Sequence, residues 1–109
     1  MPFRFNTLLP LSWFAFVCAV TLPAAAQDAA RLHQQADAAM CANCHGTEGR
    51  TVKGSVVPSI AGLPRDYMVA QMKAFKDGSR PATVMHQITK GLTDAQVASM
   101  ADYFAAQKR

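Results

Sequence analysis

Three stretches of the chain repeat apolar residues at the spacing of an α-helix, and segments rich in glycine and proline separate them. The first stretch covers residues 27–40, lacks glycine and proline, and has its apolar repeat at Leu32, Ala36, Ala39 and Met40. The second opens at residues 63–66, with Pro64 suited to a first helical turn, and ends at Gly78. No stretch alternates in the manner of a strand, so the pattern predicts a small all-α domain.

The third helix has the clearest start signal. Thr93 is followed three residues later by Gln96, the arrangement of a capping box. An apolar stripe then follows at helical spacing: Val97, Met100, Ala101 and Phe104. Residues 46–62 show no convincing period and are expected to form a loop, and residues 78–88 form a second, loop-like connection before the last helix.

The N-terminal residues 1–26 are typical of a secretory signal peptide. Arg4 supplies the positive end, residues 8–22 form an apolar run, and Ala24-Ala25-Ala26 gives a small-residue cleavage site. The alternative is an uncleaved membrane anchor, but the run is short beside the ~20 residues of a membrane span. A lipoprotein site at Cys18 is disfavoured by the bulky residues before it. We therefore expect a periplasmic mature domain of residues 27–109, without stable membrane insertion.

Cleavage of the signal peptide changes the net charge and the number of cysteines. The formal charge of +4 falls to +3 when Arg4 is lost, and Cys41 and Cys44 remain as the only cysteines. This charge does not favour a nucleic-acid partner. A domain this short buries a small core and usually needs a covalent or cofactor staple.

The run Cys41-Ala42-Asn43-Cys44-His45 provides such a staple, because it is the attachment signature of c-type haem. Two thiols on one side of a helical turn can reach the two vinyl groups of one porphyrin, and the adjacent histidine can bind its iron. A thiol-redox motif would follow a strand, and a zinc site would need a second ligand pair. Neither feature is in the sequence.

Further candidate residues lie beyond this motif. A ligating histidine generally donates its other ring N–H to a carbonyl, and Pro58 is our candidate acceptor, although it could instead simply stiffen the loop. For the opposite side of the iron, the loop-like position of Met85 favours it over the neighbouring His86, with an open position as the third option. We expect the other candidates to be core methionines on helices and a surface histidine: Met68, Met72, Met100 and His33.

From residue 38 onward the chain resembles the class I cytochromes c, especially the c553 and c4 types and the cytochrome subunit of flavocytochrome c sulfide dehydrogenase. The matching segments are residues 41–46, 58–62, 75–78, 80–85 and 101–104, with Tyr67. The resemblance implies three main helices and loops around one covalent haem c. It implies thioether bonds at Cys41 and Cys44, axial ligands His45 and Met85, and a Pro58 carbonyl behind the histidine. It also implies that the terminal helices cross, through Ala36, Met40, Tyr103 and Phe104.

These implied ligands predict an electron carrier and not an enzyme, because both axial positions of the iron are filled. The alternative is the haem subunit of a sulfide-oxidising flavoprotein. Some relatives of these types carry two haem domains, whereas this chain has one motif. Basic residues are candidates for guiding an acidic redox partner, or are ordinary surface: Arg50, Lys53, Lys73, Lys76 and Arg80.

Overall fold

The computed structural model describes Met1 and residues 21–109, and it divides the chain into two compact units, residues 1–30 and 31–109. The predicted signal peptide falls mainly on residues 2–20, outside the described residues. Helix α1 spans Thr21–His45. It therefore begins before the predicted residue 27 and continues through the whole cysteine–histidine motif. In the first unit, the side chains of residues 25–30 are exposed.

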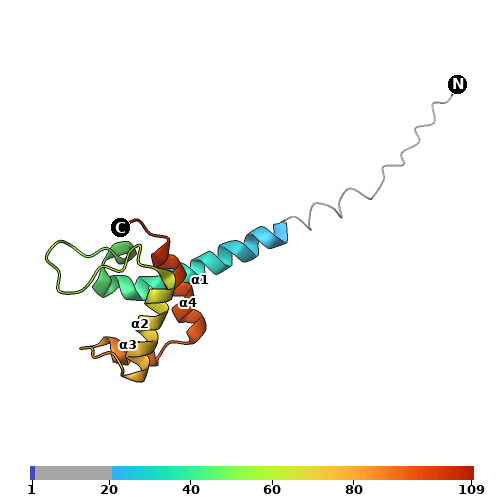
Figure 1. The fold of residues 1–109 in the computed structure, drawn as a ribbon. Coiled ribbons are helices and arrows are strands. Elements are labelled where there is room, and N and C mark those ends of the chain that lie inside the picture. The colour runs from blue at the N-terminus through green and yellow to red at the C-terminus, as the bar shows by residue number, and fades with distance from the viewer. Residues whose placement is uncertain (2–20) are drawn as a thin grey trace. The chain divides into compact units, whose positions relative to one another are not determined.

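Residues 31–109 form the second unit (Figure 1). After α1 come a short 3-10 turn, η1 (Thr47–Gly49), and three further helices: α2 (Arg65–Asp77), α3 (Met85–Lys90) and α4 (Asp94–Ala105). Helix α2 packs against both α3 and α4. No strand occurs among the described residues, and the predicted small all-α fold is confirmed.

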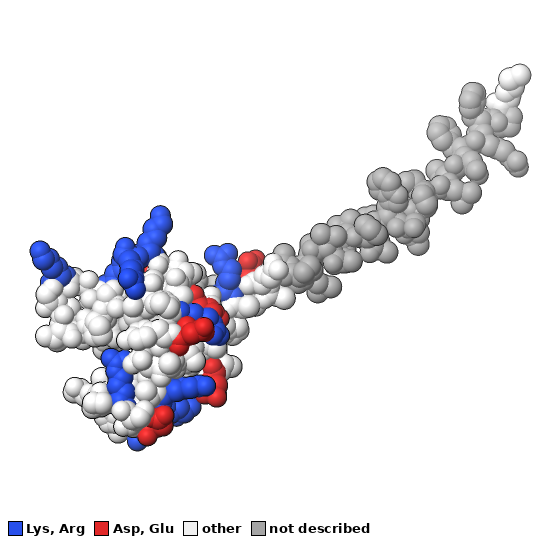
Figure 2. Space-filling model, viewed as in Figure 1, with Lys and Arg blue, Asp and Glu red and all other residues white. Residues whose placement is uncertain are grey.

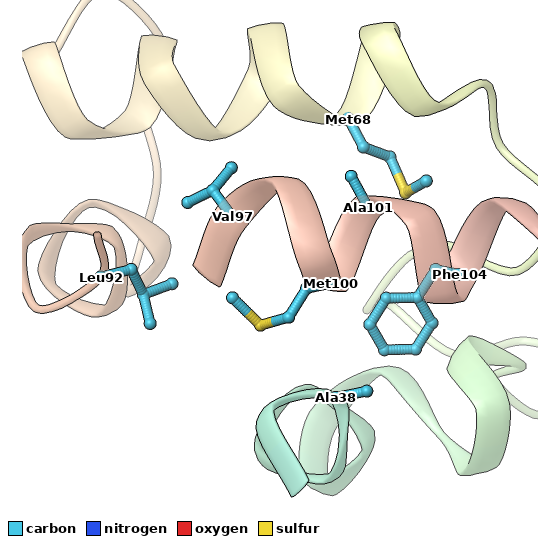
Figure 3. Packing of buried hydrophobic residues seen from close by; sticks show 7 residues of the cluster. All are labelled: Ala38, Met68, Leu92, Val97, Met100, Ala101 and Phe104. Atoms are coloured by element: carbon cyan, nitrogen blue, oxygen red, sulfur yellow. The ribbon is translucent and has the colours of Figure 1, made fainter. Parts of the chain in front are cut away.

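Helix α4 carries most of the core (Figure 3). Its Val97, Met100, Ala101 and Phe104 are all buried, as the predicted stripe requires. In the close-up, Ala101 faces Met68 of α2, whereas Met100 and Phe104 point toward α1 at Ala38. The core thus joins α1 and α2 through α4.

The ends of α2 and α4 follow their sequence signals. Gly78 ends α2 in the left-handed conformation, with φ of 83°. Thr93 Oγ1 accepts a hydrogen bond from Gln96 N at 3.2 Å, and Gln96 Oε1 accepts one from Thr93 N at 3.1 Å. The predicted capping box is confirmed. Pro64 caps α2 from just outside the helix instead of occupying its first turn.

Two sequence-based predictions are wrong. The connection after α2 is not all loop, because Met85 begins helix α3. In addition, the apolar repeat of the first helix does not mark the face that meets the core. Leu32 and Met40 are 65% and 47% exposed and Ala36 is exposed too, whereas Ala38 is buried. Helix α1 meets the core at Ala38 because Met100 and Phe104 of α4 point toward that residue (Figure 3), and Cys41 packs against the same cluster. The larger apolar residues that dominated the pattern lie on other faces of α1.

Candidate haem-attachment site

The two cysteines lie on the last turn of α1 in different surroundings. Cys41 is partly buried against the core, and its Sγ lies 3.6 Å from the sulfur of Met100. Cys44, three residues later on the same side of the helix, is exposed. Both thiols are free. Burial, and to a smaller extent Asp37 and Cys44, raises the pKa of the Cys41 thiol, so this sulfur remains protonated at neutral pH.

His45 ends α1, and its ring is fixed by a backbone carbonyl. The Nδ1 atom lies 2.7 Å from the carbonyl oxygen of Pro58. A carbonyl can only accept a hydrogen bond, so Nδ1 carries the proton and Nε2 is the nitrogen with a lone pair for a metal. The structure thus brings together His45 and Pro58, which are separated by 13 residues.

The loop between these residues is closed by backbone contacts around two glycines. Gly46 has φ of 81°, and a Cβ there would lie 1.9 Å from the Arg50 carbonyl oxygen. The Gly49 carbonyl accepts hydrogen bonds from Ser59 Oγ at 2.9 Å and from Ile60 N at 2.8 Å. These bonds hold the chain on both sides of the loop at the distance that the His45–Pro58 contact requires. Sequence reasoning identified both glycines only as loop formers.

The C-terminal segment holds the same loop from outside. Gly62 N donates to Phe104 O of α4 at 2.8 Å. Arg50 Nε donates to Lys108 O at 2.9 Å, while its Nη1 pairs with Glu48 at 2.5 Å. The loop is therefore anchored to α4 and to the residues after it.

Met85 belongs to a different part of the fold, at the first residue of α3, where it is partly buried. Its carbonyl accepts a hydrogen bond at 2.9 Å from the hydroxyl of Thr89, which is fully buried. The adjacent His86 has a buried Nδ1 for which the described residues provide no hydrogen-bond partner.

The other methionines and His33 lie where the sequence predicted. Met68 and Met100 are buried in the core, and Met72 packs against it. His33 is exposed on α1. The core role of the three methionines is confirmed, as is the surface position of His33.

Most of the basic residues proposed to guide a partner already have partners within the chain. Arg50 and Arg80 make hydrogen bonds to other side chains, and Lys76 Nζ donates to Leu92 O at 2.7 Å. Lys53 and Lys73 have no ion pair or hydrogen bond within the described part of the chain. On the face seen in Figure 2, the Lys and Arg side chains of residues 31–109 are spread out and do not form one patch.

Exposed apolar side chains flank the site residues. Met40 precedes Cys41, Val84 precedes Met85, and Val52 and Val56 lie in the loop between His45 and Pro58. Val52 and Val56 are 81% and 99% exposed, and Val84 is 51% exposed. Covering such side chains with an apolar ring removes their area from water. Together with two free thiols and a correctly protonated histidine, they fit a covalently held porphyrin.

None of the helices among the described residues is both long and apolar enough to cross a membrane. In the same part of the chain, no group of three or more His, Cys, Asp and Glu side chains is placed to hold a metal ion.

The fold and the site define a small all-α domain with a c-type haem attachment motif at the end of its first helix. The family profile for cytochrome c matches residues 29–108. The chain belongs to the cytochrome c family, and its cofactor is covalently bound haem c.

Relatives with known names support this family and the resemblance seen in the sequence. Cytochrome c-552 of Acidithiobacillus ferridurans is 42% identical over 72 residues, which are 62% of this chain and 31% of that protein. The cytochrome subunit of sulfide dehydrogenase of Chlorobaculum tepidum is 44% identical over 64 residues, 59% of this chain and 56% of that protein. Cytochrome c4 of Pseudomonas aeruginosa is 40% identical over 74 residues, 68% of this chain and 36% of that protein. The chain thus spans between about a third and just over half of the length of these relatives.

Proposed function

We propose that this chain is a periplasmic mono-haem cytochrome that carries single electrons between redox partners. In this proposal Cys41 and Cys44 hold the porphyrin by thioether bonds, and His45 and Met85 are the axial ligands. The observation that carries the proposal is the 2.7 Å contact between His45 Nδ1 and Pro58 O, directly after the Cys-x-x-Cys run. It gives the histidine the tautomer and the fixed ring that metal ligation needs.

The residues around the site have the properties of an electron carrier. Haem c, when bound, supplies an iron that cycles between Fe(II) and Fe(III), at a potential raised by a methionine ligand. With His45 and Met85 occupying both axial positions, no iron position remains open to a substrate.

Export is part of the proposal and rests on residues 1–26. The positive Arg4, the apolar run and Ala24-Ala25-Ala26 favour a signal peptide that is cleaved after Ala26. N-terminal sequencing of the protein purified from a periplasmic fraction tests this step. We expect Gln27 as the first residue, and a mature chain that still begins at residue 1 would refute cleavage.

Ligation can be tested on holoprotein made in a host that attaches c-type haem. Acid–acetone treatment should leave the haem on the protein, and its complete extraction would contradict thioether attachment. The oxidised protein should show the weak long-wavelength band of methionine-ligated haem. Met85→Ala should abolish this band, whereas His86→Ala and Met72→Ala should retain it. Absence of the band from the parent protein, with a spectrum that changes in His86→Ala but not in Met85→Ala, would transfer the distal position to His86.

A second candidate function is the haem subunit of a sulfide-oxidising flavoprotein. It is favoured by the likeness to the cytochrome subunit from Chlorobaculum tepidum and by the run at residues 80–85. A subunit would copurify with a flavoprotein in stoichiometric amounts, and sulfide would reduce its haem in the complex. A free carrier would elute alone from a size-exclusion column.

A further inference from the structure

The segment that leads from α2 to Met85 is folded back onto α2. Gly78 reverses the chain with φ of 83°, and Asp77 Oδ1 accepts a hydrogen bond from Ser79 N at 2.8 Å. Arg80 N then donates to the Ala74 carbonyl at 3.0 Å. The backbone of Arg80 therefore lies against the last turn of the helix.

The side chain of Arg80 continues this attachment. Its guanidinium carbon lies 4.6 Å from the centre of the Phe75 ring, and its Nη1 donates to Gln71 Oε1. Gln71 and Phe75 are four residues apart and so share one face of α2. The side chain is partly buried along this face and not extended into solvent. The planar guanidinium makes both contacts at once, a cation over an aromatic ring and a hydrogen bond to an amide.

The far end of the same segment is attached to α2 as well. Lys76 Nζ donates to the carbonyl of Leu92 at 2.7 Å, and Leu92 is buried in the core. Ile88 of α3 packs against that core. Met85 thus lies between two attachments to one helix, Arg80 before it and the Lys76–Leu92 contact after it.

We propose that Arg80 is a positioning residue for the distal ligand: by fixing the segment before Met85 on α2, it opposes the movement that would take Met85 off the iron. This inference rests on the proposed function, because it takes Met85 as the distal ligand. Arg80 itself touches neither the iron nor a partner in this role.

Displacement of Met85 by added imidazole measures that opposition directly. Imidazole binds the oxidised haem only when the methionine leaves, and the long-wavelength band reports the exchange. Loss of the ring contact and the hydrogen bond in Arg80→Ala should raise the affinity for imidazole about tenfold. Gln71→Ala removes only the hydrogen-bond acceptor and should raise it about threefold. The double variant should exceed Arg80→Ala by less than twofold, because both changes break one contact.

Arg65→Ala is the matched control. Like Arg80, Arg65 has two side-chain partners, Asp102 at 2.6 Å and Asp66 at 3.1 Å, but it lies at the start of α2 and has no link to residues 79–85. Its removal should change imidazole affinity by less than about twofold. An equal rise in Arg65→Ala and Arg80→Ala would reduce Arg80 to a general stabilising residue and overturn the proposal.

The remaining outcomes separate this inference from the function beneath it. If Met85→Ala keeps the band, the distal assignment itself fails. If Met85→Ala loses the band but Arg80→Ala binds imidazole like the parent protein, only the positioning role fails. Should Arg80→Ala not accumulate, Gln71→Ala decides the question, since an unchanged imidazole affinity in that variant also overturns the proposal.

Discussion

Gly49 is the residue at which the His45–Pro58 loop meets the C-terminal helix. It is buried, its φ is 79°, and its carbonyl accepts the hydrogen bonds that close the loop. A Cβ at this position would lie 2.8 Å from Ile60 Cγ1, 2.8 Å from Phe104 Cδ1 and 3.1 Å from Ala61 N. Gly49→Ala therefore places a methyl group where both backbone conformation and space oppose it.

A second glycine separates the cost of the backbone conformation from the cost of the lack of space. The left-handed conformation costs an alanine about 1–2 kcal/mol. Gly54 has a similar φ of 85°, but a Cβ there meets nothing within 4 Å. Overpacking a core costs a further ~1–3 kcal/mol, and Phe104, at 2% exposure, has no room to withdraw. We expect Gly49→Ala to lose about 2–5 kcal/mol of unfolding free energy and Gly54→Ala about 1–2 kcal/mol.

Urea unfolding of both oxidised holoproteins measures this difference, with the slope of the transition as a check that the unfolding remains two-state. In a domain of this size, each kcal/mol corresponds to about 4–8 °C in Tm, so thermal scans should separate the variants. Phe104→Leu, which vacates the ring edge, should make Gly49→Ala less costly, with a coupling of about 0.5–3 kcal/mol. If the two alanine variants lose stability equally, the packing of Gly49 against Phe104 is not what fixes the loop.

Substitutions at three other positions test the helix ends and the core. Thr93→Ala removes the N-cap of α4 and should cost about 0.5–2 kcal/mol in urea unfolding, while Thr93→Ser should cost less; equal losses would contradict the cap. Leu92→Ala empties a buried position beside α2 and should cost about 2–5 kcal/mol in the same assay, and a loss below about 1 kcal/mol would refute its burial. Hydrogen bonds from Ser79 lower the pKa of Asp77, so the carboxylate stabilises the fold above its unfolded-state pKa and this contribution is lost as the pH falls through the lowered value. Asp77→Ala should therefore flatten the acid side of the stability profile, and a parallel profile would exclude this role.

The elements that could be predicted from the sequence are those whose ends carry local signals. Gly78 and the Thr93–Gln96 box mark the boundaries of α2 and α4 through contacts within a few residues. The apolar stripe of α4 faces the core along the whole helix, so its helical spacing can be recognised in the sequence. The haem motif is likewise local, because five consecutive residues contain its chemistry.

The features that escaped prediction depend on contacts between distant segments. Helix α3 has only six residues, too few for a visible period, and Ile88 and Thr89 pack because α2 lies beside them. Ala38 is buried because α4 approaches it, and a pattern that weights large apolar residues selects Leu32 and Met40 instead. The contacts of Arg80 arise only after Gly78 has turned the chain back over Gln71 and Phe75.

Phe104 connects the two halves of the candidate site. Its ring packs toward Ala38, one turn before the cysteines (Figure 3). The same ring lies beside Gly49, whose carbonyl closes the loop. Its own carbonyl accepts the hydrogen bond from Gly62 at the end of that loop. Phe104 of α4 therefore contacts both the helix that carries His45 and the loop that carries Pro58. Because a hydrogen bond of 2.7 Å tolerates little displacement of either partner, the orientation of His45 depends on this packing as much as on the motif itself.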